Sequence, residues 1–129
     1  MLRTGILNPA LLHLLARIRH TNTLVIADRG FPFWPKIETV DLALVDDVPT
    51  VLQVLDAVRA NFQIGRVHAA EEFKHHNSTE RVEALTSRLG KTPLVFEPHS
   101  EFKKRVPSAI GLIRTGDTVQ YANLIIESA

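Results

Sequence analysis

The hydrophobic positions of the chain follow two spacings in turn, one typical of helices and one typical of strands. Apolar residues at helical spacing predict helices over residues 8–20, 49–62, 77–90 and 100–106. Continuous or alternating apolar runs predict strands over residues 23–28, 39–44, 66–70, 93–97, 109–115 and 121–128. Because strands separated by helices form a sheet with helices packed on its faces, the pattern predicts an α/β fold.

The connections between these elements refine the expected fold. Only the short turn 116–120 joins the last two strands, so we expect them to pair antiparallel. The sheet is then mixed, mostly parallel, and flanked by helices. No linker, repeat or low-complexity segment divides the chain, which predicts a single domain over residues 1–129.

Local signals mark the ends of the helices. Asn8 is expected to cap the first helix, with Pro9 in the first turn, where its missing N–H costs nothing. Asn77 and Glu80 are spaced like a capping box at the start of the third helix, and Gly90 is expected to end it.

Composition narrows the classes of function. The 129 residues are 45% hydrophobic, enough for a sizeable core, and the net charge is only +1. The basic residues are scattered, without the stripe that nucleic-acid binding needs. No apolar run approaches the roughly 20 residues that span a bilayer. With no cysteine and no secretory signal pattern, we expect a cytoplasmic protein that binds neither nucleic acid nor membrane.

Titratable residues gather where predicted strands end. Asp28 ends the first strand, the pair Glu71 and Glu72 follows the third, and His99 lies just past the fourth. Ligands of open α/β sheets bind at this carboxyl end of the strands, so these side chains are candidates for a site.

Each candidate also has a plainer interpretation. His20 closes the first helix and suits a cation near a helix C-terminus. Asp28 suits a turn over Gly30, and His99 suits a surface loop. Tyr121 and Asn123 are expected on one face of the last strand, where burying Asn123 without partners is costly. That cost favours a polar cavity above the strand.

The segment "EEFKHHN" at residues 71–77 mixes histidine and glutamate but does not have metal-ligand spacing. His75 and His76 are adjacent and point apart on any regular element, and the order differs from the His-Glu-x-x-His zinc pattern. We expect Glu72 instead either to orient another group of the site or to pair with a Lys or Arg side chain. We expect no metal, and no cofactor either, because no phosphate-binding glycine loop is present.

The remaining polar groups are imidazole, carboxylate, phenol and amide. Histidine exchanges protons near neutral pH, and Asp and Asn bind hydroxyls, so this set suits proton transfer on a hydroxyl-rich ligand. From the residues alone, the prediction is a small α/β domain with an acid/base site.

Eight short blocks in order add a resemblance. They are "GILN" at 5–8, "HTNTLVIADRGFP" at 20–32, "VDLAL" at 40–44, "VPTVLQVL" at 48–55, "AEEFKHHN" at 70–77, "HSEFK" at 99–103, "IRTGD" at 113–117 and "YAN" at 121–123. The chain resembles the D-ribose pyranase family, which shares its fold with the L-fucose mutarotases. The resemblance implies interconversion of the pyranose and furanose forms of ribose, without cofactor or metal.

The resemblance also implies roles for individual residues. It makes His20 the catalytic proton donor and acceptor. It assigns sugar binding to five residues, namely Asp28, His99, Tyr121, Ala122 and Asn123. A neutral His99 would bridge sugar hydroxyls through both ring nitrogens. It further implies a ring-like homo-oligomer, a decamer, with sites built between neighbouring subunits, so that His20 serves its own subunit or a neighbour.

Two departures and two alternatives stay open. The first departure from the family pattern is Arg29, which stands where a small residue is usual and is expected either at the pocket mouth or outside it. The second is the end of the chain at "IIESA", without the family's apolar tail. The alternatives to a ribose isomerase are a mutarotase of fucose or another monosaccharide, and a non-catalytic sugar-binding or transport-associated protein. His20 favours an enzyme, and His99 favours ribose, because the mutarotases carry a different basic residue there.

Overall fold

The computed structural model describes residues 1–3 and 5–129. Six strands build one sheet, namely β1 (Thr23–Ala27), β2 (Thr39–Asp41), β3 (Ile64–Ala70), β4 (Leu94–Glu97), β5 (Gly111–Arg114) and β6 (Leu124–Ser128). The helices of the described residues are α1 (Pro9–Arg17), α2 (Val51–Arg59), α3 (Glu71–His76), α4 (Thr79–Leu89), α5 (His99–Arg105) and the 3₁₀ turn η1 (Val106–Ser108).

The strands lie in the order β2-β5-β1-β6-β3-β4. The pairs β1–β5, β2–β5 and β3–β4 are parallel, whereas β6 runs antiparallel to both β1 and β3. The predicted α/β fold with a mixed, mostly parallel sheet is confirmed. The predicted pairing of the last two strands is wrong, because β1 lies between β5 and β6.

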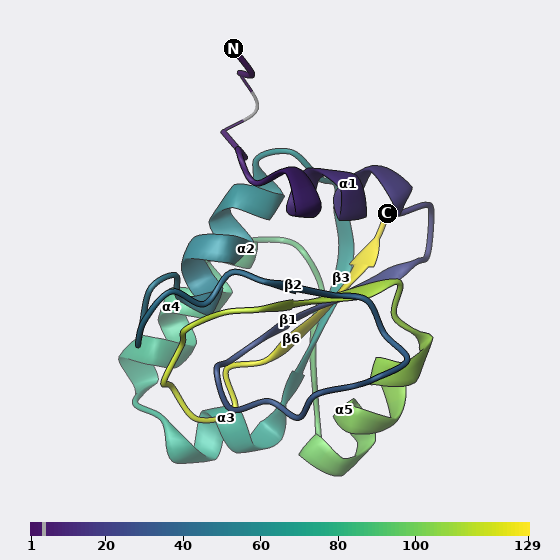
Figure 1. Ribbon diagram of the computed structural model, residues 1–129. Helices are drawn as coiled ribbons and strands as arrows, with labels where there is room; N and C mark the ends of the chain where they lie inside the picture. The colour runs from purple at the N-terminus through teal and green to yellow at the C-terminus, as the bar shows by residue number, and fades with distance from the viewer. Residues whose placement is uncertain (4) are drawn as a thin grey trace.

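Each face of the sheet carries its own hydrophobic core. Side chains alternate across the sheet, so Leu24 and Ile26 of β1 pack on one face and Val25 and Ala27 on the other. The first face is covered by α1, α2 and α4, and the second by α5, whose Phe102 is fully buried. Figure 1 shows this three-layer arrangement, with α3 and α5 near one another at the lower end of the sheet.

Polar side chains cap the helices, partly as predicted. The Asn8 side chain accepts a hydrogen bond from the N–H of Leu11, and Gly90 ends α4 with a positive φ of 54°. The cap of α4 is Ser78 and not Asn77, so that part of the prediction is wrong. Thr50, after Pro49, forms a capping box with Gln53 at the start of α2.

Two segments differ from the sequence-based expectation in ways that affect the site. Residues 71–76, left unassigned in the sequence pattern, form the short helix α3. Strand β6 begins at Leu124, so Tyr121 and Asn123 precede it in a turn instead of sharing a strand face. Tyr121 has φ 57°, in the left-handed region that no β-strand residue adopts. Among the described residues, no helix is long and apolar enough to cross a membrane.

Candidate functional site

A pocket of about 310 Å³ opens where β1 and β4 end and the turn before β6 begins. Its size is within the range of small-molecule sites, about 300–1,000 Å³. It brings together four of the predicted sugar-binding residues from distant parts of the chain. The lining consists of Asp28, Gly30, Phe31, Pro32, His76, His99, Gln120, Tyr121 and Asn123.

Asp28 and Asn123 are locked together at the floor of this pocket. The backbone N–H of Asp28 donates to Oδ1 of Asn123 at 2.7 Å, and Nδ2 of Asn123 donates to Oδ2 of Asp28 at 3.0 Å. Asn123 is 2% exposed, so both ends of its amide are satisfied within the protein. The burial cost that sequence reasoning attached to Asn123 is thus met by Asp28.

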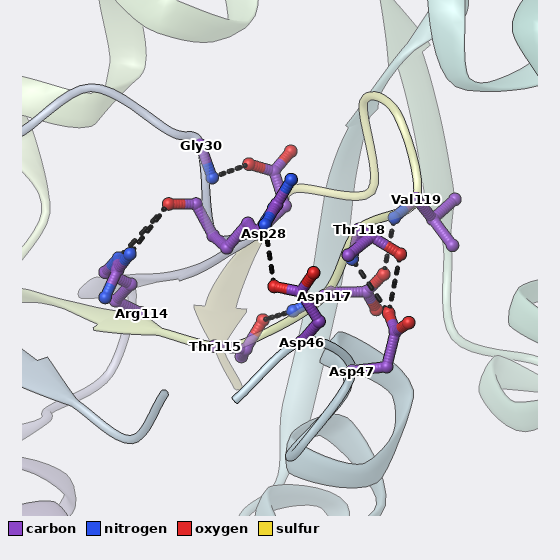
Figure 2. Close-up of polar contacts among 10 residues, drawn as sticks. Asp28, Gly30, Asp46, Asp47, Arg114, Thr115, Asp117, Thr118 and Val119 are labelled. Carbon is purple, nitrogen blue, oxygen red and sulfur yellow. Dashed lines mark hydrogen bonds and ion pairs between the residues drawn. The ribbon is translucent and has the colours of Figure 1, made fainter. Parts of the chain in front are cut away.

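The second carboxylate oxygen of Asp28 accepts the N–H of Gly30 at 2.9 Å, which closes the turn after β1 (Figure 2). The turn over Gly30 and the pocket position therefore coexist. Partial burial raises the pKa of Asp28, and the hydrogen bond from Asn123 opposes that shift. The carboxylate is thus a hydrogen-bond acceptor with a strengthened affinity for protons.

His99 is the first residue of α5, and its ring is enclosed by aromatic side chains. Phe102 stacks on it at 5.8 Å between ring centroids, and Tyr121 and Phe31 meet it edge-on at 5.2 and 6.3 Å. Burial lowers the pKa of His99, so the ring is neutral near pH 7. The interpretation of His99 as a surface-loop residue is wrong.

The two ring nitrogens of His99 are not equivalent. Nδ1 is buried without a hydrogen-bond partner, which leaves Nε2 as the nitrogen available to a ligand. The expected bridging of hydroxyls through both nitrogens is therefore wrong in this conformation. A neutral imidazole with one accessible nitrogen forms a single hydrogen bond, as donor or acceptor according to its tautomer.

Tyr121 and His76 form the adjoining part of the pocket wall. Their ring centroids are 5.2 Å apart, and both side chains line the pocket. The sequence analysis assigned no role to His76. Its neighbour His75 is exposed and does not line the pocket, because adjacent residues on a helix point in different directions. Ala122 is buried in the hydrophobic core and does not line the pocket.

Hydrogen bonds tie the segment before β6 to the loop before α2, and Figure 2 shows those of Asp47 with Thr118. The buried carboxylate of Asp117 accepts the N–H groups of Val51 and Val119, both at 2.8 Å, and so joins the turn before β6 to the start of α2. Asp47 accepts the N–H and hydroxyl of Thr118 at 2.9 and 2.7 Å. These contacts fix the chain that carries Tyr121 and Asn123.

Arg29 points away from the pocket. Its guanidinium pairs with Asp46 at 2.6 Å, and both side chains are more than half exposed. Its backbone oxygen accepts two hydrogen bonds from Arg114 at 3.2 and 3.1 Å, as Figure 2 shows. Of the two placements that the sequence left open, the structure supports the one outside the pocket.

His20 is not among the residues that line this pocket. It is exposed in the turn before β1, whereas Asp28 follows the other end of that strand. A strand of this length spans about 16 Å. Within one chain, His20 and Asp28 therefore do not converge.

The pocket also contains groups that sequence reasoning did not select. Gly30, Phe31 and Pro32 follow Asp28 in the block "HTNTLVIADRGFP". An aromatic residue so close to a candidate site aspartate was a signal that could have identified Phe31. Gln120 carried no such signal. Among residues 1–3 and 5–129, no group of three or more His, Asp or Glu side chains is arranged to hold a metal ion.

Comparison with known proteins places this geometry in a family. Residues 1–129 match the RbsD / FucU transport protein family. The chain is 42% identical over 128 residues to the D-ribose pyranase of Geobacillus kaustophilus, covering 99% of this chain and 93% of the relative. It is 41% identical over 128 residues to the D-ribose pyranase of Laribacter hongkongensis, covering 99% and 97%.

Solved structures agree with these sequence relations. The structure of Bacillus subtilis RbsD complexed with D-ribose superposes with a TM-score of 0.93 at 32% identity, covering 100% of this chain and 98% of the other. The fucose mutarotase of Streptococcus pneumoniae in complex with L-fucose shares the fold, with a TM-score of 0.80 at 17% identity and coverage of 95% and 92%. The chain thus belongs to the RbsD / FucU transport protein family.

Proposed function

We propose that the protein is an isomerase that interconverts the pyranose and furanose forms of D-ribose. The observation that carries this proposal is the full-length similarity to RbsD complexed with D-ribose, at 32% identity and a TM-score of 0.93. The curated relatives named D-ribose pyranase, at 33–42% identity, point to the same reaction.

The reaction moves protons and breaks one C–O bond. The hydroxyl on C1 of the sugar loses its proton, the ring oxygen gains one, and the bond between C1 and the ring oxygen breaks to give the open-chain aldehyde. Rotation about a C–C bond then presents another hydroxyl, which attacks C1; its proton leaves, and the aldehyde oxygen takes up a proton to become the new hydroxyl on C1. General acid/base catalysis contributes about 10²–10⁴-fold to such a step.

The pocket residues are suited to holding the sugar. Asp28 accepts hydrogen bonds from hydroxyls, and Nε2 of His99 supplies one further polar contact. Tyr121 offers an aromatic face and a hydroxyl group. Asn123, whose amide is already engaged by Asp28, acts by fixing that carboxylate. We assign direct sugar binding to Asp28, His99 and Tyr121, and to Asn123 an indirect part in it, through the carboxylate that it orients. Ala122 is buried and contributes no side chain to the pocket.

We assign the proton transfer to His20 supplied by a neighbouring subunit. Its separation from the pocket along β1 supports this assignment, because a proton donor must come within hydrogen-bond reach of the sugar. The loop between β2 and α2 exposes three large apolar side chains that association between subunits would cover. They are Leu44, Val45 and Val48, which are 77%, 61% and 46% exposed. The proposed assembly is a homo-oligomer, a decamer.

A mutarotase of fucose is the second candidate, because the fucose mutarotase of Streptococcus pneumoniae shares the fold. A mutarotase changes only the configuration at C1, whereas the ribose reaction also closes the ring through a different hydroxyl. A sugar-binding protein without catalysis is the third candidate. Saturation-transfer NMR with ribose and fucose separates the three, since it reads the rate of exchange between ring forms directly.

A further inference from the structure

We propose that α3 and the asparagine after it form a two-ended positioning element, in which Glu72 fixes His99 and Asn77 fixes the turn that carries Tyr121. This inference rests on the proposed function, because it assigns positioning roles around the same pocket. It gives the "EEFKHHN" segment a purpose other than metal binding.

The first end of the element is a hydrogen bond to the backbone of His99. Both carboxylate oxygens of Glu72 lie within reach of that N–H, at 3.1 and 3.0 Å. The first N–H groups of a helix have no partner inside it. Pro98, at the N-cap of α5, provides no side-chain cap, so Glu72 supplies the acceptor from another helix. The start of α5, and with it the ring of His99, is thereby held against α3.

The charge of Glu72 adds a second effect. The charged groups that act on His99 are Lys103, one turn further along α5, Glu72 and Asp28. Lys103 lowers the pKa of the imidazole, and the two carboxylates raise it against the stronger effect of burial. Glu72 therefore influences the protonation of His99 as well as its position.

The second end of the element is the side-chain amide of Asn77. Nδ2 donates to the carbonyl of Phe73 and to the carbonyl of Gln120, both at 2.9 Å. The next residue, Tyr121, has φ 57°, a conformation that persists only where the surroundings hold it. The ring of His76 packs against the Tyr121 ring at 5.2 Å. Asn77 and His76 together fix this wall of the pocket.

The middle of the element is anchored in the core. Phe73 is 6% exposed and packs in the same hydrophobic core as the inner strands. A helix of six residues is not stable in isolation, so its position comes from these tertiary contacts. Both polar ends then lead to residues that line the pocket.

The Glu72 end is tested with two substitutions and a matched control. Glu72→Ala removes the acceptor and the charge, whereas Glu72→Gln keeps an acceptor and removes the charge. Glu71→Ala removes the adjacent glutamate of the same first turn, whose side chain makes no hydrogen bond or ion pair with the described residues. Ribose exchange gives KM and kcat for each, and NMR titration gives the pKa of His99, assigned by its absence in His99→Gln.

Glu72→Ala is expected to raise the KM for ribose, up to about 10²-fold, because small displacements of a positioning group cost that much. Glu72→Gln should keep KM near wild type while the pKa of His99 falls. Glu71→Ala should match wild type in both. An unchanged KM in Glu72→Ala, or an unchanged pKa of His99 in Glu72→Gln, would overturn this end of the proposal.

The Asn77 end has an equally close control. Asn61 donates through Nδ2 to the carbonyl of Ala57, four residues back at the end of α2, as Asn77 does to Phe73. Asn61→Ala thus removes the same local contact without touching the pocket. Tyr121 is the only tyrosine of the chain, so fluorotyrosine labelling gives one ¹⁹F signal for this wall.

Asn77→Ala is expected to shift or broaden the Tyr121 signal and to raise the KM for ribose, whereas Asn61→Ala does neither. Indistinguishable spectra and KM values for the two variants would overturn the Asn77 end. If wild type does not accelerate ribose exchange, the proposed function fails. The His99 titration and the Tyr121 signal then decide the positioning role on their own.

Discussion

Asp28 and Asn123, 95 residues apart in the chain, exchange two hydrogen bonds at the floor of the pocket. One joins the backbone of Asp28 to the amide oxygen of Asn123, and the other joins the amide nitrogen to the carboxylate. The pair connects the end of β1 to the turn that leads into β6, the antiparallel strand beside it. It therefore stabilises the fold and orients the Asp28 carboxylate in the pocket lining.

Asn123→Ala should affect both properties. The loss of the amide leaves the half-buried N–H of Asp28 without its partner and removes one hydrogen bond to the carboxylate, which costs about 1–3 kcal/mol in the free energy of unfolding. The amide also lowers the pKa of Asp28, so that pKa should rise in the variant. Urea unfolding and carboxyl ¹³C titration measure the two effects, and ribose binding should weaken. A variant with wild-type stability and an unchanged Asp28 pKa would contradict the role of this pair.

Arg29→Ala should leave ribose exchange unchanged. The guanidinium contacts Asp46, not the pocket, and exposed ion pairs contribute at most about 1 kcal/mol. Asp46→Ala serves as the matched variant, because it removes the other partner of the same pair. Ring-exchange rates that fall in Arg29→Ala but not in Asp46→Ala would show that Arg29 reaches the sugar after all.

Stability should decrease as the pH falls below 6.5. The pKa of His68, on β3, is lowered, and burial is the main cause. Its Nδ1 lies 3.9 Å from Glu97 and has no hydrogen-bond partner among the described residues. Glu97 is instead engaged by Arg105 at 2.6 and 3.0 Å. Above pH 6.5 the histidine is neutral in both states. Below it the unfolded chain binds the proton and the folded chain does not, so the free energy of unfolding falls.

His68→Gln should reduce this slope, and His99→Gln should do the same, because the pKa of His99 is also lowered. His13→Gln, at an exposed position on α1, is the control and should keep the wild-type slope. Urea unfolding at several pH values gives the comparison. A slope unaffected by both substitutions would show that neither buried histidine carries the pH dependence.

Catalysis by His20 across a subunit boundary predicts complementation. His20→Ala and Asp28→Asn should each abolish accelerated ribose exchange. Mixed oligomers of the two variants should recover part of it, since some sites then combine an intact His20 from one chain with an intact Asp28 from another. Mixed oligomers as inactive as the separate variants, with co-assembly verified by mass spectrometry, would argue that both residues must belong to one chain.

The fold was largely predictable from local patterns, and the site only in part. A continuous apolar run identifies β1, and the Asn8 cap helps to identify α1. Residues after parallel strands gather at one edge of the sheet, which brings Asp28 and His99 together. The insertion of β6 between β1 and β3 depends on pairing across the whole chain. No local spacing encodes that pairing.

The missed features have related causes. Helix α3 is short and buries only Phe73, so it lacks a periodic apolar face. The left-handed backbone of Tyr121 is held by contacts from α3 and is not a preference of tyrosine. The separation of His20 from the pocket follows from the length of β1, and a local sequence pattern does not show whether a neighbouring subunit brings the two together.

The most direct test of the account is saturation-transfer NMR of wild-type protein with D-ribose and, in parallel, L-fucose. We predict accelerated exchange between the pyranose and furanose signals of ribose above the rate in buffer, with a smaller effect on fucose. Acceleration of fucose anomer exchange without any effect on ribose would contradict the account and favour the mutarotase. Saturable ribose binding without faster exchange would contradict it too, in favour of a sugar-binding protein.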